Sequence, residues 1–233
     1  MAHEPGTTVA DPAPPGTWST FAVLAGLLVF PLANILLLPG LFRSAAAIER
    51  LGRVAWWGFI VWTLVWEWGL FILIRSALGR EGRTLRDIGL PLPGRAEIAI
   101  IGTVIVAVAI GGFVTGGGTP PASIGPGLAW LLPAAPLERV VWVPVCMTAG
   151  ICEETIFRGL GITELRRGPL RLGGAVVVTS LAFVLAHGLN QGWGYASRVA
   201  IALGLAGLFL WRKNLRASIY VHALIDLAAL LAV

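Results

Sequence analysis

Residues 54–78 read VAWWGFIVWTLVWEWGLFILIRSAL, an apolar run whose charged side chains are Glu67 and Arg75. A helix needs about 20 consecutive apolar residues to cross the hydrocarbon layer of a membrane, and this run exceeds that length. The layer holds no water for open backbone groups, so a crossing segment must form its hydrogen bonds internally. The run therefore predicts a membrane-spanning helix. Other apolar runs of similar length along the chain predict further helices of this kind.

Similar apolar runs fill most of the chain. The 233 residues are 57% hydrophobic and 12% charged, whereas a soluble domain carries about 25% charged residues. This composition excludes an ordinary soluble enzyme and a disordered protein. We predict an all-α, polytopic transmembrane helix bundle of about seven spans, within a range of roughly six to eight. The expected spans are Thr20–Phe42, Val54–Leu78, Glu97–Thr115, a fourth from about Leu137 to Arg158, Leu172–His187, Ala196–Trp211 and Leu215–Val233.

The remaining segments suggest one domain with a short tail. Residues 1–18 are rich in Pro, Gly, Ala and Thr and hold no Lys or Arg, so they lack the basic region of a signal peptide. We expect residues 1–18 to be a disordered tail and residues 19–233 to form a single transmembrane domain.

The basic charge points to a membrane and not to nucleic acid. Lys213 is the single lysine among 17 basic residues, and the net charge is +5. With alternating spans, the arginine-rich loops Arg75–Arg95, Glu164–Arg171 and Arg212–Arg216 fall on one side, which predicts that this side is cytoplasmic. Arg43–Arg53 falls on the other side and does not fit. We expect a multi-pass protein of the cell membrane with its active site near the cytoplasmic side.

Ionisable residues gather in three of the later spans. Such residues are costly inside a membrane and mark functional sites by default. The fourth span ends in EETIFR, the fifth ends in FVLAH, and the seventh contains HALID. These segments are Glu153–Arg158, Phe183–His187 and His222–Asp226.

Helical spacing gives these side chains their expected neighbours. Glu154 and Arg158 lie four residues apart and can pair on one helix face, while Glu153 points about 100° away and is available for another partner. His222 and Asp226 are also four apart, so the carboxylate can orient the imidazole.

Phe183 precedes His187 by one turn and can pack beneath its ring. A buried glutamate with two histidines is suited to general-base activation of water.

The patterns EExxxR, FxxxH and HxxxD resemble the three motifs of the CPBP intramembrane endopeptidases, and they occur here in the family order. That family includes the type II CAAX prenyl endopeptidase and bacterial relatives that process bacteriocins and peptide signals or confer immunity. The resemblance implies an endopeptidase that hydrolyses a membrane-associated peptide or protein without a cofactor, with its catalytic core at about residues 137–233.

The resemblance also implies a role for each motif residue. Glu153 would activate water, and His187 would share that water. His222, with Asp226, would stabilise the oxyanion on the scissile carbonyl. Many family members carry Asn at the position of Asp226, and an ionised Asp cannot donate a hydrogen bond. Asp226 must therefore be protonated or must act by orienting His222. The site-supporting residues would be Glu154, Arg158 and Phe183.

Other functions remain open from the sequence. Glu153, His187 and His222 could together bind zinc, which would make the protein a metalloprotease. The chain could also be a non-proteolytic immunity or partner-binding module of the same fold. A transporter is a further alternative, because buried Glu and His also serve proton relays. The expected partners are membrane lipid and a peptide or protein substrate with a membrane-associated segment, and no nucleic acid. Glu67 is expected in the core or at the membrane interface, or as the partner of an arginine.

Overall fold

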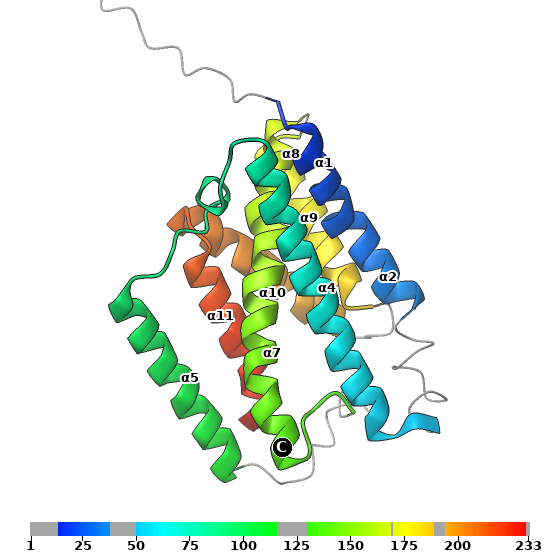
Figure 1. Ribbon diagram of the computed structural model, residues 1–233, viewed down its shortest axis with the longest axis vertical. Coiled ribbons are helices and arrows are strands. Elements are labelled where there is room, and N and C mark those ends of the chain that lie inside the picture. The colour runs from blue at the N-terminus through cyan, green and yellow to red at the C-terminus, as the bar shows by residue number, and fades with distance from the viewer. Residues whose placement is uncertain (1–13, 38–49, 116–129, 169, 189–193, 232–233) are drawn as a thin grey trace, which may run out of the picture.

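The computed structural model describes residues 14–37, 50–115, 130–168, 170–188 and 194–231. Regular structure within these ranges is helical, and they contain no strand (Figure 1). The all-α prediction is confirmed. Residues 1–13 of the predicted tail lie outside the described ranges, and the first helix begins at Thr17.

Each predicted span corresponds to a helical segment. The first segment joins α1, η1 and α2, and the fourth joins α7, η4 and α8, without a break in the helical backbone. The segments are α1 (Thr17–Leu24), η1 (Ala25–Val29), α2 (Phe30–Leu36), α4 (Arg53–Arg80), η3 (Leu85–Ile88), α5 (Arg95–Thr115), α7 (Pro136–Glu154), η4 (Thr155–Ile162), α8 (Thr163–Arg167), α9 (Leu172–Ala186), α10 (Gly194–Arg212), α11 (Arg216–Leu227) and η5 (Ala228–Leu231).

Five of the described helical segments are long and apolar enough to cross a membrane. They are Thr17–Leu36, Arg53–Arg80, Arg95–Gly112, Pro136–Arg167 and Gly194–Arg212. The two other predicted spans are shorter, because α9 is an apolar helix of 15 residues and α11 has 12. The structure is thus a multi-pass helical bundle in which two of the predicted crossings are short helices.

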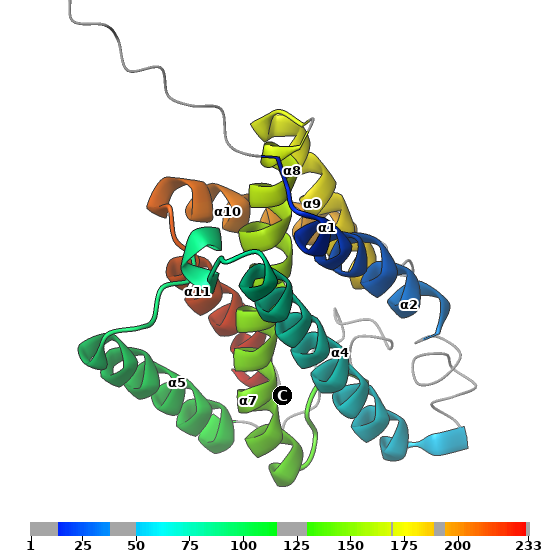
Figure 2. The same ribbon diagram turned by 45° about the horizontal axis from the view of Figure 1, so that its top comes forward.

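Helix α7 runs through the middle of the bundle. It packs against α4, α5 and α11, whereas α9 packs against α2, α10 and η4 (Figures 1 and 2). Pro136 begins α7, and the Glu138 carboxylate accepts hydrogen bonds from the backbone N–H groups of Ala134 and Ala135 at 2.8 and 2.9 Å. Because α7 continues through η4 into α8, one long helical segment carries the whole EExxxR motif.

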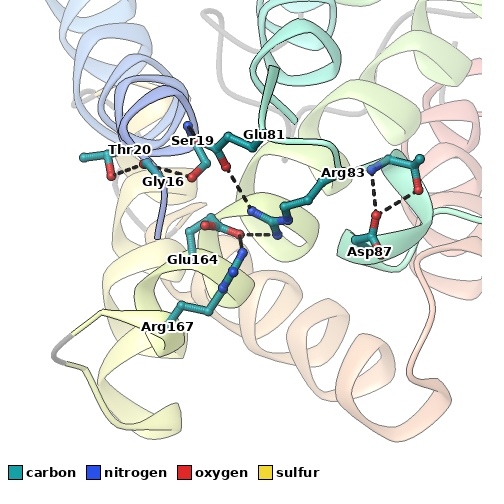
Figure 3. Close-up of polar contacts among 9 residues, drawn as sticks. Gly16, Ser19, Thr20, Glu81, Arg83, Asp87, Glu164 and Arg167 are labelled. Carbon is teal, nitrogen blue, oxygen red and sulfur yellow. Dashed lines mark hydrogen bonds and ion pairs between the residues drawn. The ribbon is translucent and has the colours of Figure 1, made fainter. Parts of the chain in front are cut away.

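The three arginine-rich loops meet at one end of the bundle. The backbone N–H of Leu215 donates to Gly89 at 2.7 Å, and Arg83 Nη2 lies 2.6 Å from Glu164 Oε1 (Figure 3). Ion pairs and hydrogen bonds therefore connect the end of α4 to α8 and to the start of α11. The expectation that these loops share a side agrees with this arrangement.

Arg53 lies at the opposite end, where α4 begins. Its Nε donates to Glu138 Oε1 at 2.8 Å, and its Nη1 donates to the Trp130 carbonyl at 3.0 Å. Arg53, one of the arginines that do not fit the charge pattern, is thus neutralised by a glutamate on α7. Arg43 lies outside the described residues.

Candidate active site

The two adjacent glutamates of α7 face different partners. Glu154 Oε1 accepts a hydrogen bond from Arg158 Nη1 at 2.7 Å, and Arg158 Nη2 donates to the Ala202 carbonyl at 3.1 Å. Glu154 and Arg158 are 0% and 1% exposed. The i, i+4 spacing in the sequence therefore produces a fully buried ion pair, which connects the α7–η4 segment to α10.

His222 on α11 approaches the same glutamate. Its Nδ1 lies 2.8 Å from Glu154 Oε1, and its Nε2 lies 3.5 Å from Asp226 Oδ2. The His222 ring is 3% exposed. Each ring nitrogen thus faces a carboxylate, and these contacts fix the orientation of the imidazole.

Glu153 points away from this cluster, towards His187 at the end of α9. Its Oε2 lies 4.0 Å from His187 Nε2. His187 Nδ1 lies 2.8 Å from the Phe183 carbonyl, and the two rings are 4.6 Å apart between centroids. The backbone and the ring of Phe183 therefore hold His187 with Nε2 directed at Glu153.

Phe183 connects the two parts of the site. The Arg158 guanidinium carbon lies 4.4 Å from the Phe183 ring centroid, within the range of a cation–π contact. The Phe183 and His222 rings are 5.8 Å apart. One buried aromatic side chain thus contacts both histidines and the arginine of the ion pair.

A cavity of about 370 Å³ opens onto Glu153, His187 and Asp226. His222 lies behind this wall, with its Nε2 facing the Asp226 carboxylate. A volume of this size lies within the roughly 300–1,000 Å³ of ligand sites. The other polar side chains in the wall are Asn34, Thr63, Glu67, Ser197 and Arg198.

Residues 135–228 match the family model described as type II CAAX prenyl endopeptidase Rce1-like. These residues are similar to an Rce1-like domain. The matched range contains the three motifs described above, so the predicted resemblance to CPBP-family intramembrane proteases is confirmed. The match supports an intramembrane endopeptidase of the CAAX type. Neither a curated protein nor a solved structure matches the chain.

Helices outside the matched range complete the cavity. Asn34 on α2 donates through Nδ2 to the Ala186 carbonyl at 2.9 Å and accepts from Trp62 Nε1 at 3.1 Å. Glu67 on α4 is 1% exposed and interacts electrostatically with Glu153 and Asp226. Glu67 therefore belongs to the site and not to the membrane interface. Its position within an apolar run was the signal that the sequence offered.

Arg198 is a second wall residue that the sequence analysis did not select. It lies on α10, within the matched range, and it interacts electrostatically with Asp226 and Glu153. Its Nε atom is buried and has no hydrogen-bond partner in the described part of the chain. Arg198 lies within the predicted span Ala196–Trp211, and its charge inside that apolar run was the signal that the sequence offered.

The zinc alternative requires Glu153, His187 and His222 to direct their donor atoms at one point. Instead, both nitrogens of His222 face carboxylates, and Nε2 of His187 faces Glu153. Among the described residues, no three His, Cys, Asp or Glu side chains are arranged to hold a metal ion.

Proposed function

We propose that the protein hydrolyses a peptide bond of a membrane-associated peptide or protein, using water activated by Glu153 and His187. The observation that supports this proposal is the 4.0 Å separation between Glu153 Oε2 and His187 Nε2 in the wall of the cavity. This distance exceeds a direct hydrogen bond, but one water molecule can bridge it. The site therefore has a place for the nucleophile between two groups that can accept its proton.

The contacts of His187 set its tautomer. The Phe183 carbonyl can only accept a hydrogen bond, so Nδ1 carries the proton that is shared with it at 2.8 Å. In the neutral ring, Nε2 then holds the lone pair and faces Glu153. His187 can thus accept a hydrogen bond from the water and orient it.

The reaction then follows the general-base scheme. The Glu153 carboxylate removes a proton from water, and the water oxygen adds to the carbonyl carbon of the substrate. The tetrahedral intermediate loses its amine when the carbon–nitrogen bond breaks and Glu153 returns the proton to the nitrogen. The products are a carboxylic acid and an amine, and the enzyme regains its starting state.

Positive charge near the cavity stabilises the oxyanion. Arg198 lies in the wall, and His222 lies behind Asp226. The 3.5 Å contact between Asp226 and His222 supports an orienting role for Asp226, which an ionised carboxylate can fulfil. The Glu154–Arg158 pair supports the site by holding His222 through its Nδ1 atom.

The position of the cavity bears on the side from which a substrate enters. Its wall includes Leu131 and Leu132 before α7 and Ser197 near the start of α10. These residues lie in the half of the bundle away from the arginine-rich loops, which follow α4, α8 and α10. The cavity wall thus extends towards the end opposite these loops, and the side on which the active site opens stays a prediction. Labelling of R166C with a membrane-impermeant maleimide tests the sidedness, and labelling only after permeabilisation would place these loops in the cytoplasm.

The catalytic proposal is tested in membranes of cells that express the protein. Mass spectrometry compares new peptide termini in membranes that contain wild type, E153Q or H187A. We expect termini with wild type that both variants lose by a factor of at least about 100, the typical contribution of a general base. Equal sets of termini in all three samples would favour the non-proteolytic module.

A chelator arm addresses the zinc alternative. Loss of the termini on chelation, with recovery on addition of zinc, would replace the glutamate mechanism by a metalloprotease mechanism.

A further inference from the structure

A second, larger cavity lies on the other face of α7. It has a volume of about 960 Å³ and is bounded by α4, α5, α7 and α11. Met147 and Ile151 of α7 line this cavity. The smaller cavity, which contains Glu153, is lined by Cys146 and Ala149 of the same helix. Helix α7 therefore separates the two cavities, and each cavity would bind its own ligand.

Helix α5 is scarcely packed against the rest of the bundle. Only 6% of its apolar span is buried, compared with 67% of the span that contains α7. In both ribbon views, α5 lies at the edge of the molecule (Figures 1 and 2). An apolar helix that the protein leaves unburied faces lipid, so lipid has access to the space between α5 and α4.

The walls of this space suit an acyl chain. Ile98, Ile101 and Ile105 of α5 face Phe71 of α4 and Ile219 of α11 across the cavity. Residues 98 to 105 extend about 10 Å along the helix axis. We call this space, lined by α4, α5, α7 and α11, the lateral groove.

Arginines surround the groove at the end where the arginine-rich loops meet. Arg83 and Arg216 are held in ion pairs with Glu164 and Glu97. Arg75 and Arg86 are exposed, and no ion pair joins either one to a carboxylate in the described part of the chain. Their positive charge is available to an anionic group at the level of the lipid headgroups.

We propose that the lateral groove binds one anionic glycerophospholipid, with its phosphate at Arg75 and Arg86 and an acyl chain between α4 and α5. Charge complementarity at the mouth and apolar walls below it select this occupant over a zwitterionic lipid. The bound lipid would also contact Ile219 and Tyr220, which precede His222 on α11, and would thereby support the helix that carries the histidine. Binding at this groove does not depend on the proposed hydrolysis.

The test titrates the full-length protein in detergent with phosphatidylglycerol or with phosphatidylcholine of the same acyl chains. Native mass spectrometry counts the bound lipids. We expect one phosphatidylglycerol to bind tightly, and the double variant R75Q/R86Q to weaken it roughly 25-fold, or about fivefold per arginine. Binding of phosphatidylcholine should be unchanged by this variant.

Matched controls separate the groove from general surface charge. The double variant R95Q/R166Q removes two exposed arginines outside the groove and should change the affinity by no more than about twofold. An equal loss in this control would overturn the proposal.

A second variant fills the groove itself. Gly102 lines the groove, and a Cβ there would meet no atom within 4 Å, so G102L should fold and exclude the lipid. The control G204L places a leucine at an equally open position on α10. If G102L and R75Q/R86Q both still bound phosphatidylglycerol as tightly as wild type, the proposal would also be overturned.

Discussion

Glu154 connects Arg158 to His222, a residue 68 positions further along the chain. Its Oε1 lies 2.7 Å from Arg158 Nη1 and 2.8 Å from His222 Nδ1. Glu153, the preceding residue, faces the cavity of about 370 Å³ and His187 instead. The two neighbouring glutamates thus have different surroundings, since Glu154 contacts Arg158 and His222 and Glu153 lines the cavity.

This division predicts opposite phenotypes for E154Q and E153Q. E154Q leaves the buried Arg158 without its anion, so the free energy of unfolding should fall by on the order of 3 kcal/mol. E153Q keeps the packing and should melt close to wild type, while cleavage falls at least about 100-fold. Thermal melting in detergent and the peptide-terminus assay measure the two effects. If E153Q destabilised the protein as much as E154Q, the division would be wrong.

Glu67 predicts a second pair of variants. It is buried on α4 beside Glu153, and two adjacent carboxylates repel unless a proton lies between them. E67Q places an uncharged hydrogen-bond donor at this position and should retain most of the activity. E67L removes the donor and should lower kcat by roughly 10- to 100-fold, the typical effect of losing a hydrogen bond to a charged group.

The comparison between these two variants separates positioning from packing. Both remove the charge of Glu67, and leucine leaves the polar cavity wall without its donor. Equal activity of E67Q and E67L would show that Glu67 does not position Glu153. Activity should follow the presence of the donor even if the two variants melt at similar temperatures.

Contacts within one helix were predictable from the sequence, because helical geometry fixes them. The Glu154–Arg158 pair, the Asp226–His222 contact and the packing of Phe183 under His187 all join residues four apart. The divergence of Glu153 from Glu154 follows from the same periodicity. The all-helical fold was predictable because a membrane permits few alternatives.

Contacts between helices were not predictable in the same way. The approach of Glu67 to Glu153 depends on which face α4 presents to α7, and the contact of His222 with Glu154 depends on how α11 packs there. No spacing in the sequence encodes either one. The depth of the cavity in the bundle could not be predicted for the same reason, since loop charges describe the ends of helices and not the space between them.

Close packing of α7 on α11 gives a further prediction. A Cβ at Gly150 would lie 2.8 Å from the Ile219 carbonyl oxygen and 3.3 Å from the Ala223 Cβ. G150A should push α11 away from α7 and displace His222 from Glu154, with loss of both activity and stability. G207A on α10, where a Cβ meets nothing within 4 Å, serves as the control and should resemble wild type. Normal cleavage by G150A would show that the position of α11 is not critical.

The pH dependence of stability provides a prediction outside the membrane spans. Burial alone would raise the pKa of Glu81, but hydrogen bonds from Ser19 and Arg83 hold that pKa below its ordinary value (Figure 3). A carboxylate with a lowered pKa stabilises the fold above its unfolded pKa of about 4.3, and this contribution is lost as the pH falls through the folded pKa. E81Q should therefore melt below wild type at neutral pH, and the gap between their melting temperatures should narrow progressively as the pH falls below about 4. A gap that stays constant across this range would show that the Glu81 contacts with Ser19 and Arg83 contribute nothing to docking α1 against the end of α4.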